Sequence, residues 1–272
     1  MEARAGGARP PVIVKLGGSV ITRKREVERI RPKVLDRLCR ELWEPRDARL
    51  IVLHGAGSFG HPGARRFGLA RPPEDGVPPE HRARGAAIVA AEVRRLHSEV
   101  LRALVRAGAP AISVPIATHA RNRSGRLAAL DPAPFVDALG RGTMPVSFGD
   151  VVPDEAWGFS ILSADTIAAA LTPALRPARV VFVSDVLGIL SGPSGGKRSV
   201  VSEVTDAVVD ALRPPLGAPD VTGGIRAKAE AMRAIARAGT DAGLISGLTD
   251  GALSRAIRGE AVYGSWAHAE AR

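Results

Sequence analysis

Residues 54–61 read His-Gly-Ala-Gly-Ser-Phe-Gly-His, and this stretch decides how the chain is interpreted. It follows the apolar run Leu50-Ile51-Val52-Leu53, so it begins where a buried strand should end. Three glycines within six residues let the backbone approach a ligand closely and direct several N–H groups at one point. Such a loop suits an anion, and phosphate is the commonest candidate. The alternative is a glycine-rich turn that only joins a strand to a helix.

The composition limits the classes of protein to consider. The chain has 272 residues, of which 45% are hydrophobic, enough for one large α/β domain or two smaller ones. The net charge of +10 is compatible with nucleic-acid binding, but the arginines are dispersed and only 4% of residues are aromatic. A basic surface also attracts polyanionic nucleotides. We therefore expect no nucleic-acid partner.

The single cysteine and the distribution of apolar residues bear on location. Cys39 cannot form an intrachain disulfide, and its place among Leu35, Leu38 and Leu42 predicts a small buried residue. No apolar run approaches the ~20 residues that a membrane-spanning helix requires. Residues 1–11 lack the apolar core of a secretory signal. We expect a cytoplasmic protein with no membrane partner.

Strand and helix patterns alternate along the chain. The expected strands are 12–16, 50–53, 111–114, 144–148, 180–183 and 243–246. The expected helices are 32–43, 80–107, 134–139, 163–171, 203–212 and 224–238. Residues 71–79 should form an exposed connection or lid, and residues 121–126 a polar turn or hairpin tip. The alternation predicts an α/β fold with a mostly parallel sheet covered by helices on both faces.

Residues suited to phosphate binding fall where strands end or helices begin. In an open α/β sheet, ligands gather at the carboxyl ends of the strands. The stretches in question are Lys15, Gly17-Gly18-Ser19, the loop 54–61, Gly149-Asp150, Ser184-Asp185 and Thr222-Gly223-Gly224. The last stretch opens a helix, and Lys228 on its first turns can reach a phosphate bound at that helix start.

Motifs for several other chemistries are missing from the sequence. It contains no Walker A loop, no G-x-G-x-x-G after the first strand, no H-E-x-x-H and no G-x-S-x-G. Three lysines, Lys15, Lys24 and Lys228, with two glycine loops favour phosphoryl transfer by positioning and charge neutralisation. The alternative for each lysine is a solvated surface charge.

Four motifs, in this order, resemble the amino acid kinase superfamily. They are Lys15-Leu16-Gly17-Gly18-Ser19, the loop 54–61, Asp185-Val186-Leu187-Gly188-Ile189, and Asp220-Val221-Thr222-Gly223-Gly224 with Lys228. The Gly-Ser-Phe-Gly-His ending of the second motif, followed by Pro62, resembles the isopentenyl phosphate kinase branch, as do Lys24 and Gly149-Asp150-Val151-Val152. The resemblance covers roughly residues 12–248.

This resemblance implies a three-layer α/β/α sandwich with a mostly parallel central sheet. It implies one domain over residues 1–272, with an acceptor-binding part at about 12–150 and a nucleotide-binding part at about 160–260. ATP with Mg²⁺ would phosphorylate isopentenyl phosphate or dimethylallyl phosphate for isoprenoid biosynthesis, usually in a homodimer. The alternatives are a kinase of this fold acting on another small phosphate or phosphonate, such as a fosfomycin-type resistance kinase, and a non-catalytic nucleotide-binding protein of this fold.

The resemblance also implies roles for individual residues. The nucleotide-binding residues would be Lys15, Gly17, Gly18, Ser19, Gly57, Asp185, Gly224 and Lys228. The acceptor-binding residues would be Ala56, Gly60, His61 and Ala164. The catalytic residues would be Lys15, Lys24, His61 and Lys228, with His61 as a phosphate-orienting donor rather than a general base, and no protein ligand to a metal is assigned. Ser163-Ala164-Asp165 departs from the family pattern Ser-Gly-Asp, which puts a backbone contact to the substrate in question.

An isoprenoid tail would need an apolar trench leading away from His61. The expected wall is the start of the helix 80–107, which carries alanines, among them Ala83, Ala86, Ala87 and Ala90, in place of bulky side chains. The alternative is that these alanines only let the helix pack closely.

Overall fold

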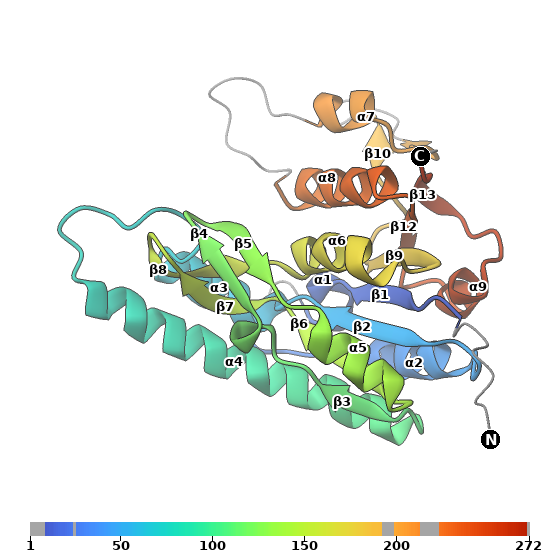
Figure 1. Cartoon of the computed structure of the whole chain (residues 1–272), viewed down its shortest axis with the longest axis horizontal. Coiled ribbons are helices and arrows are strands. Elements are labelled where there is room, and N and C mark those ends of the chain that lie inside the picture. The colour runs from blue at the N-terminus through green and yellow to red at the C-terminus, as the bar shows by residue number, and fades with distance from the viewer. Residues whose placement is uncertain (1–8, 24–25, 192–198, 213–222, 271–272) are drawn as a thin grey trace, which may run out of the picture.

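A computed structural model describes residues 9–23, 26–191, 199–212 and 223–270. Seven of the described strands form a central sheet in the order β13-β12-β9-β1-β2-β6-β3 (Figure 1). They are β1 (Val12–Leu16), β2 (Leu50–His54), β3 (Ala111–Ser113), β6 (Met144–Phe148), β9 (Arg179–Ser184), β12 (Asp241–Ser246) and β13 (Gly264–Ala267). All neighbouring strands are parallel except β12 and β13. The predicted mostly parallel sheet is confirmed.

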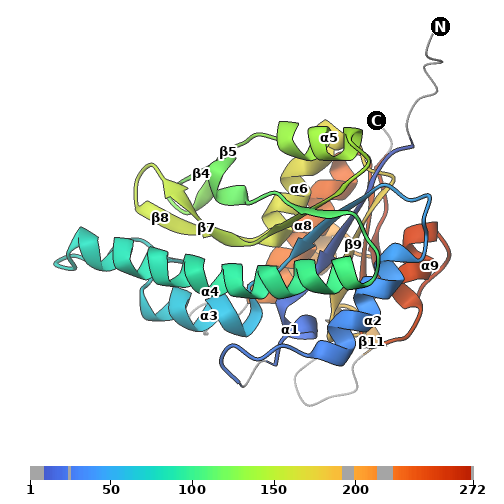
Figure 2. The same ribbon diagram turned by 90° about the horizontal axis from the view of Figure 1, so that it is seen from below.

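Helices cover both faces of this sheet (Figures 1 and 2). Side chains alternate along β1, so Val12, Val14 and Leu16 enter one apolar cluster and Ile13 enters the other. The first cluster is completed by α1 (Gly18–Ile21), α2 (Pro32–Trp43), α4 (Pro79–Arg106) and α9 (Ala252–Arg258). The second is completed by α5 (Ala133–Gly140), α6 (Ala164–Leu175) and α8 (Gly223–Arg237). The predicted three-layer α/β/α sandwich is confirmed.

A second, four-stranded sheet stands beside the central one and was not predicted. Its order is β5-β4-β7-β8, formed by β4 (Ala120–Arg123), β5 (Arg126–Leu130), β7 (Asp150–Asp154) and β8 (Gly158–Leu162). The polar turn expected at 121–126 is the β4–β5 hairpin, with positive φ at Ser124 and Gly125. The inward residues of β4 are Ala120 and Asn122, so the strand carries almost no hydrophobic alternation.

α3 (Gly57–Arg66) begins inside the glycine loop and packs along α4 (Figure 2). Gly60 and Gly63 allow this close packing, because a Cβ at either position would lie 2.7 Å from Val93 or Val89 of α4. The remaining elements are the 3₁₀ turn Ile116–Thr118, β10 (Leu190–Ser191), β11 (Ser199–Val200) and α7 (Asp206–Ala211). Within the described ranges, none of the helices has the length and apolar character needed to cross a membrane.

Candidate active site

The two glycine loops touch each other at the carboxyl edge of the central sheet. Gly55 N–H donates to the Leu16 carbonyl (2.9 Å), which holds the second loop against the end of β1. A Cβ at Gly18 would lie 2.3 Å from Gly57 N, and one at Gly57, whose φ is +51°, would lie 2.3 Å from Thr22 Oγ1. Only glycine fits at this crossing. Two stretches assigned to one site from the sequence therefore lie in direct contact.

Two lysines share one carboxylate beside these loops. Lys15 Nζ and Lys228 Nζ each lie 2.7 Å from a different oxygen of Asp165. The three side chains come from β1, α8 and α6 and are only 9%, 10% and 14% exposed, in that order. Two cations and one anion leave a net positive charge, which suits the phosphates of a nucleotide.

Asp165 was not among the residues assigned to the site from the sequence. It directly follows Ala164 in a motif that was noted, and its position in the first turn of α6 was the available signal. What the sequence does not display is that one carboxylate holds lysines from two distant elements. Asp165 therefore joins Lys15 and Lys228 as the organising residue of the cluster.

The charges in this cluster depend on one another. Burial, together with the neighbouring Lys15, lowers the pKa of Lys228 to about 8. Burial acts to raise the pKa of Asp165, but Lys15 and Lys228 outweigh it and hold that pKa at about 2. Asp165 is thus ionised at neutral pH, whereas Lys228 keeps its charge by a narrow margin. A bound polyanion would widen that margin.

A second polar contact ties the first glycine loop to the end of β9. The Ser19 hydroxyl donates to Asp185 Oδ1 at 2.6 Å, and the Ser184 hydroxyl lies 3.3 Å from the same oxygen. Gly224, in the first turn of α8, is exposed at this edge. Ser19, Asp185 and Gly224, which the sequence assigned to the nucleotide, therefore come from three different elements. Lys24, Asp220 and Thr222 lie outside the described residues.

The start of α3 carries the residues assigned to the acceptor. Ala56 is the N-cap of this helix, and its carbonyl accepts from Phe59 N–H at 3.1 Å and from Gly60 N–H at 3.3 Å. Ser58 N–H donates to Thr22 Oγ1 at 3.0 Å. His61 keeps solvent-accessible surface, yet the protein around it removes enough water to lower its pKa, and Arg65 and Lys15 lower it further. The ring is therefore neutral at neutral pH and offers one N–H donor. Gly60 is packed against Ala56 and α4.

Ala164 is accommodated without disturbing the helix start. Its side chain is 3% exposed and belongs to the apolar cluster that includes Ile167 and Ala168. Gly149, at the β6–β7 junction, packs against Ala164, because a Cβ added at Gly149 would lie 3.0 Å from Ala164 N. The methyl group that distinguishes Ala164 from glycine therefore lies in the core.

The described residues contain no group of three or more His, Cys, Asp or Glu side chains arranged to hold a metal ion. A Mg²⁺ ion that arrives with a nucleotide needs only one or two carboxylates, because phosphate oxygens and water supply its other ligands. Asp185, which accepts a hydrogen bond from Ser19 and was assigned to the nucleotide from the sequence, fits that requirement.

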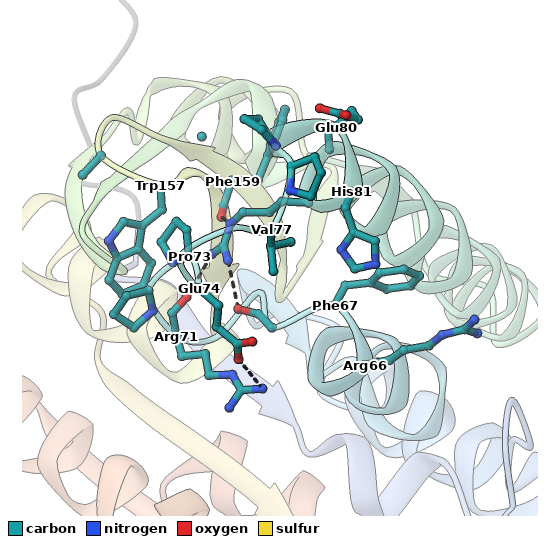
Figure 3. A pocket seen from close by; sticks show the side chains of 18 residues that line it. Arg66, Phe67, Arg71, Pro73, Glu74, Val77, Glu80, His81, Trp157 and Phe159 are labelled. Carbon is teal, nitrogen blue, oxygen red and sulfur yellow. Dashed lines mark hydrogen bonds and ion pairs between the residues drawn. The ribbon is translucent and has the colours of Figure 1, made fainter.

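A cavity of about 540 Å³ lies beyond the far end of α3, between the start of α4 and the β7–β8 turn (Figure 3). Apolar side chains dominate its lining, among them Phe67, Val77, Trp157 and Phe159. Residues 71–79, expected to be an exposed connection, form one of its walls and are exposed throughout. Ala83 of α4 also lines it.

Arg82 fixes the shape of this cavity. The Arg82 guanidinium donates to the backbone carbonyls of Phe159, Gly68 and Arg71 at 2.9, 3.0 and 3.1 Å. These bonds tie the start of α4 to the β7–β8 hairpin and to the chain that follows α3. Arg82 is 8% exposed, and burial lowers its pKa. The charged guanidinium therefore stabilises the backbone around the cavity through these three hydrogen bonds.

Residues 10–246 match the amino acid kinase family. The isopentenyl phosphate kinase of Methanothermobacter thermautotrophicus is 33% identical over 93% of this chain and 97% of that protein. The isopentenyl phosphate kinase of Arabidopsis thaliana is 30% identical over 91% of this chain and 90% of that protein. The chain belongs to the amino acid kinase family.

Solved structures agree with this membership. An isopentenyl phosphate kinase structure superimposes with a TM-score of 0.83 at 30% identity, covering 94% of this chain and 99% of that one. The Thermoplasma acidophilum isopentenyl phosphate kinase in its product complex gives a TM-score of 0.75 at 28% identity, covering 95% of this chain and 100% of that one. The resemblance to the isopentenyl phosphate kinase branch, noted from the second glycine loop, is confirmed.

Proposed function

We propose that this protein transfers the γ-phosphoryl group of ATP to isopentenyl phosphate, forming isopentenyl diphosphate and ADP for isoprenoid biosynthesis. The observation that carries the proposal is the Lys15–Asp165–Lys228 cluster beside two touching glycine loops, with His61 at the start of α3. The similarity to isopentenyl phosphate kinases over most of the chain supports the choice of acceptor.

In the proposed step, an oxygen of the acceptor phosphate attacks the γ-phosphorus, and the bond from that phosphorus to the oxygen bridging the β- and γ-phosphates breaks. The acceptor phosphate is already ionised near neutral pH, so no strong base is required. The obstacle is the repulsion between two polyanions, which positioned cations and N–H donors offset. Lys15 and Lys228 supply the cations.

On the nucleotide side, the first loop, Gly17-Gly18-Ser19, would hold the phosphates through the backbone N–H groups of Gly18 and Ser19, joined by Gly57 of the second loop. The Gly17 N–H donates to the Val183 carbonyl at 2.7 Å and so fixes this loop against the end of β9. The start of α8 at Gly224 would add N–H groups, as helix starts do for phosphate. Asp185 is the residue that would hold Mg²⁺ together with the ATP phosphates. The ion would supply further charge neutralisation when bound.

On the acceptor side, Ala56, Gly60 and His61 at the start of α3 would bind the acceptor phosphate, with the backbone of Ala164 nearby. His61 would act as a neutral hydrogen-bond donor, in keeping with its lowered pKa. Lys24 would complete the charge around the transferred group.

The prenyl tail would run from His61 along α3 toward the cavity at the end of that helix. Its apolar lining and its place between α4 and the β7–β8 turn support this direction. Dimethylallyl phosphate, which has a tail of the same length, would be accepted too.

A homodimer and a cytoplasmic location are the last parts of the proposal. β3 is an edge strand of the central sheet; its Ile112 is 47% exposed, and Val105, near the end of α4, is 59% exposed. An open edge flanked by apolar side chains is suited to pairing with a second copy of the chain. A single cysteine, with no disulfide possible within the chain, fits the reducing cytoplasm, and cell fractionation tests that location.

The function is tested by ADP release from ATP with isopentenyl phosphate, dimethylallyl phosphate and fosfomycin measured side by side. We expect the two prenyl phosphates to be phosphorylated far more efficiently than fosfomycin. Preference for fosfomycin would identify a resistance kinase, and no turnover of any acceptor with intact ATP binding would identify a non-catalytic nucleotide-binding protein.

A further inference from the structure

A chain of three polar side chains, two of them buried, lies behind the second glycine loop. His54, the last residue of β2, is 0% exposed, and His97 of α4 is 6% exposed. His54 Nε2 lies 3.0 Å from His97 Nδ1, and His97 Nε2 lies 2.7 Å from Ser113 Oγ on β3. At the other end, His54 Nδ1 lies 3.2 Å from the Gly55 carbonyl oxygen. None of these side chains takes part in the transfer described above.

The Gly55 carbonyl fixes the direction of every hydrogen bond in this chain. A carbonyl oxygen only accepts, so His54 must carry its proton on Nδ1. Burial, together with His97, lowers the pKa of His54 to about 3, and burial, together with Arg94, lowers that of His97 to about 4. Both rings are therefore neutral, with one N–H each. His54 Nε2 then accepts from His97 Nδ1–H, and His97 Nε2 accepts from the Ser113 hydroxyl.

Aromatic packing holds the two rings in this arrangement. The Phe148 ring stacks on His54 with centroids 5.4 Å apart and planes 18° apart, and it contacts the His97 ring at 4.3 Å. With a fixed tautomer and a fixed plane, His54 directs its N–H at one place only, the Gly55 carbonyl.

That carbonyl belongs to the peptide that leads into Ala56. In a trans peptide the C=O of one residue and the N–H of the next point in opposite directions. The described peptides are all trans. Since Gly55 O is directed toward the buried His54 ring, the Ala56 N–H is directed away from it, at the N-cap of α3. A Cβ at Gly55 would lie 2.9 Å from Gly18 N, so this residue also packs closely against the first loop.

We propose that His54, whose Nδ1–H donates to the Gly55 carbonyl and whose Nε2 accepts from His97 Nδ1–H, is a positioning residue that aims the Ala56 N–H at the acceptor phosphate. The proposal rests on the function proposed above, because it assigns the acceptor phosphate to the start of α3. It makes His97 of α4 and Ser113 of β3, neither of which was assigned to the site from the sequence, supporting residues of the acceptor site.

The tautomers are the first test, and they do not depend on activity. Long-range ¹H–¹⁵N correlation spectra of the unliganded protein report which ring nitrogen carries the proton, and a histidine-to-glutamine variant of each of the six histidines assigns the signals. We expect Nδ1–H for both His54 and His97. An Nε2–H form of His54 would overturn the proposal, whether or not the enzyme phosphorylates isopentenyl phosphate.

The second test uses the shape of the replacement side chain. In His54→Asn the amide nitrogen lies near the former Nδ1 position and still reaches Gly55, whereas in His54→Gln it lies near Nε2 and does not. We expect kcat/KM for isopentenyl phosphate to fall by about 10²-fold in H54Q, the scale of a misplaced binding group, with KM for ATP unchanged. H54N should recover most of that loss although it leaves His97 without its partner.

Thr143→Val serves as the matched control. It removes a hydrogen bond of 2.7 Å, from Thr143 Oγ1 to the Ala138 carbonyl, at the opposite end of β6. Thr143→Val should lower thermal stability, and any change in kcat/KM should be the same for isopentenyl phosphate and for ATP. Equal losses for ATP and acceptor in H54Q, or no difference between H54N and H54Q, would show that the three side chains only stabilise the fold and would reject the proposal.

Discussion

A single carboxylate, Asp165, decides whether two lysines can remain charged side by side. Lys15 and Lys228 would repel each other in a nearly dry site, and the ionised Asp165 between them at 2.7 Å from each offsets that repulsion. The lysines can then be held ready for a polyanion before it binds. Preorganised charge of this kind needs no rearrangement during the reaction.

Asp165→Asn should therefore damage both stability and turnover. Removing one partner from a buried ionic group costs about 3–5 kcal/mol. Because the pKa of Asp165 is held at about 2, below its ordinary 3.8, its contribution is present above that range and lost as the pH falls through it. The stability gap between wild type and D165N should thus narrow from about pH 4 toward pH 2, as thermal unfolding would show. Asp137→Asn, which breaks the exposed pair with Arg141, should change little.

Lys228 should set an alkaline limit to activity. Its pKa of about 8 in the free protein means that its charge is lost as the pH rises through that value. We expect kcat/KM for ATP to decline above about pH 8, and Lys228→Arg, whose guanidinium stays charged, to bind ATP without that decline. A wild-type profile flat to pH 10 would remove Lys228 from the phosphate site.

The same shift acts on stability with the opposite sign. Between pH 8 and 10.5 the unfolded chain binds a proton at Lys228 that the folded protein does not, so the Lys228 contribution to the free energy of unfolding rises with pH. If kcat/KM falls above pH 8 while the free energy of unfolding does not, the loss of activity comes from the loss of the Lys228 charge and not from unfolding.

His61 should matter for the acceptor and not for ATP. His61→Ala should lower turnover by about 10²-fold, the effect of losing one preorganised donor. His61→Gln should retain more activity because an amide can still donate. Steady-state kinetics in both substrates check this, with the exposed His268→Ala as control. An equal loss of ATP affinity in H61A would place the side chain on the nucleotide side.

At the scale of elements, α4 is divided between core and cavity. Ala86 lies in the core with Val89 and Phe148, Ala87 is exposed, and Ala83 lines the 540 Å³ cavity. Of the alanines considered as the wall of a tail trench, Ala83 is therefore the one that lines the cavity. A large residue at Ala86 would test packing rather than substrate length.

Ala83→Phe should shorten the range of acceptors. The wild type should phosphorylate geranyl phosphate as well as the C5 acceptors, and filling the cavity should abolish the longer substrate while sparing isopentenyl phosphate. The comparison is kcat/KM for both acceptors, with Ala87→Phe, one turn along on the exposed face, as the matched control. Parallel losses for short and long tails in A83F would mean that the tail lies elsewhere.

At the scale of the whole molecule, both halves of the chain build one sheet. β1, β2, β3 and β6 come from the part assigned to the acceptor, and β9 and β12 from the part assigned to the nucleotide, while β13 follows that part at Gly264–Ala267. This shared sheet supports the prediction of one domain over residues 1–272, which the family resemblance implied. β3 lies at an open edge of this sheet.

The proposed dimer uses that edge. Val105→Glu combined with Ile112→Glu should convert a dimer into a monomer, because two buried charges would face each other across the interface. Light scattering after gel filtration measures the mass directly. Tyr263→Glu, at a residue 68% exposed on another part of the surface, should leave the dimer intact. A wild-type monomer would dismiss the dimer outright.

The sequence by itself determined the alternation of strands and helices, the mostly parallel central sheet, the two glycine loops and the family. These are local properties, because the period of hydrophobic residues and the spacing of glycines can be seen within short stretches of the sequence. It also named Lys15, His61 and Lys228 through motifs that each lie within a few positions.

Only the tertiary structure decided which residues act together. Asp165 between two lysines, His54 bonded to His97 and Ser113, and the cavity at Ala83 all join elements distant in the chain. The second sheet escaped prediction for a related reason, since the buried face of β4 consists of Ala120 and Asn122. Burial and pairing across elements depend on how helices and strands pack. A local sequence pattern does not indicate which residues far apart in the chain come into contact.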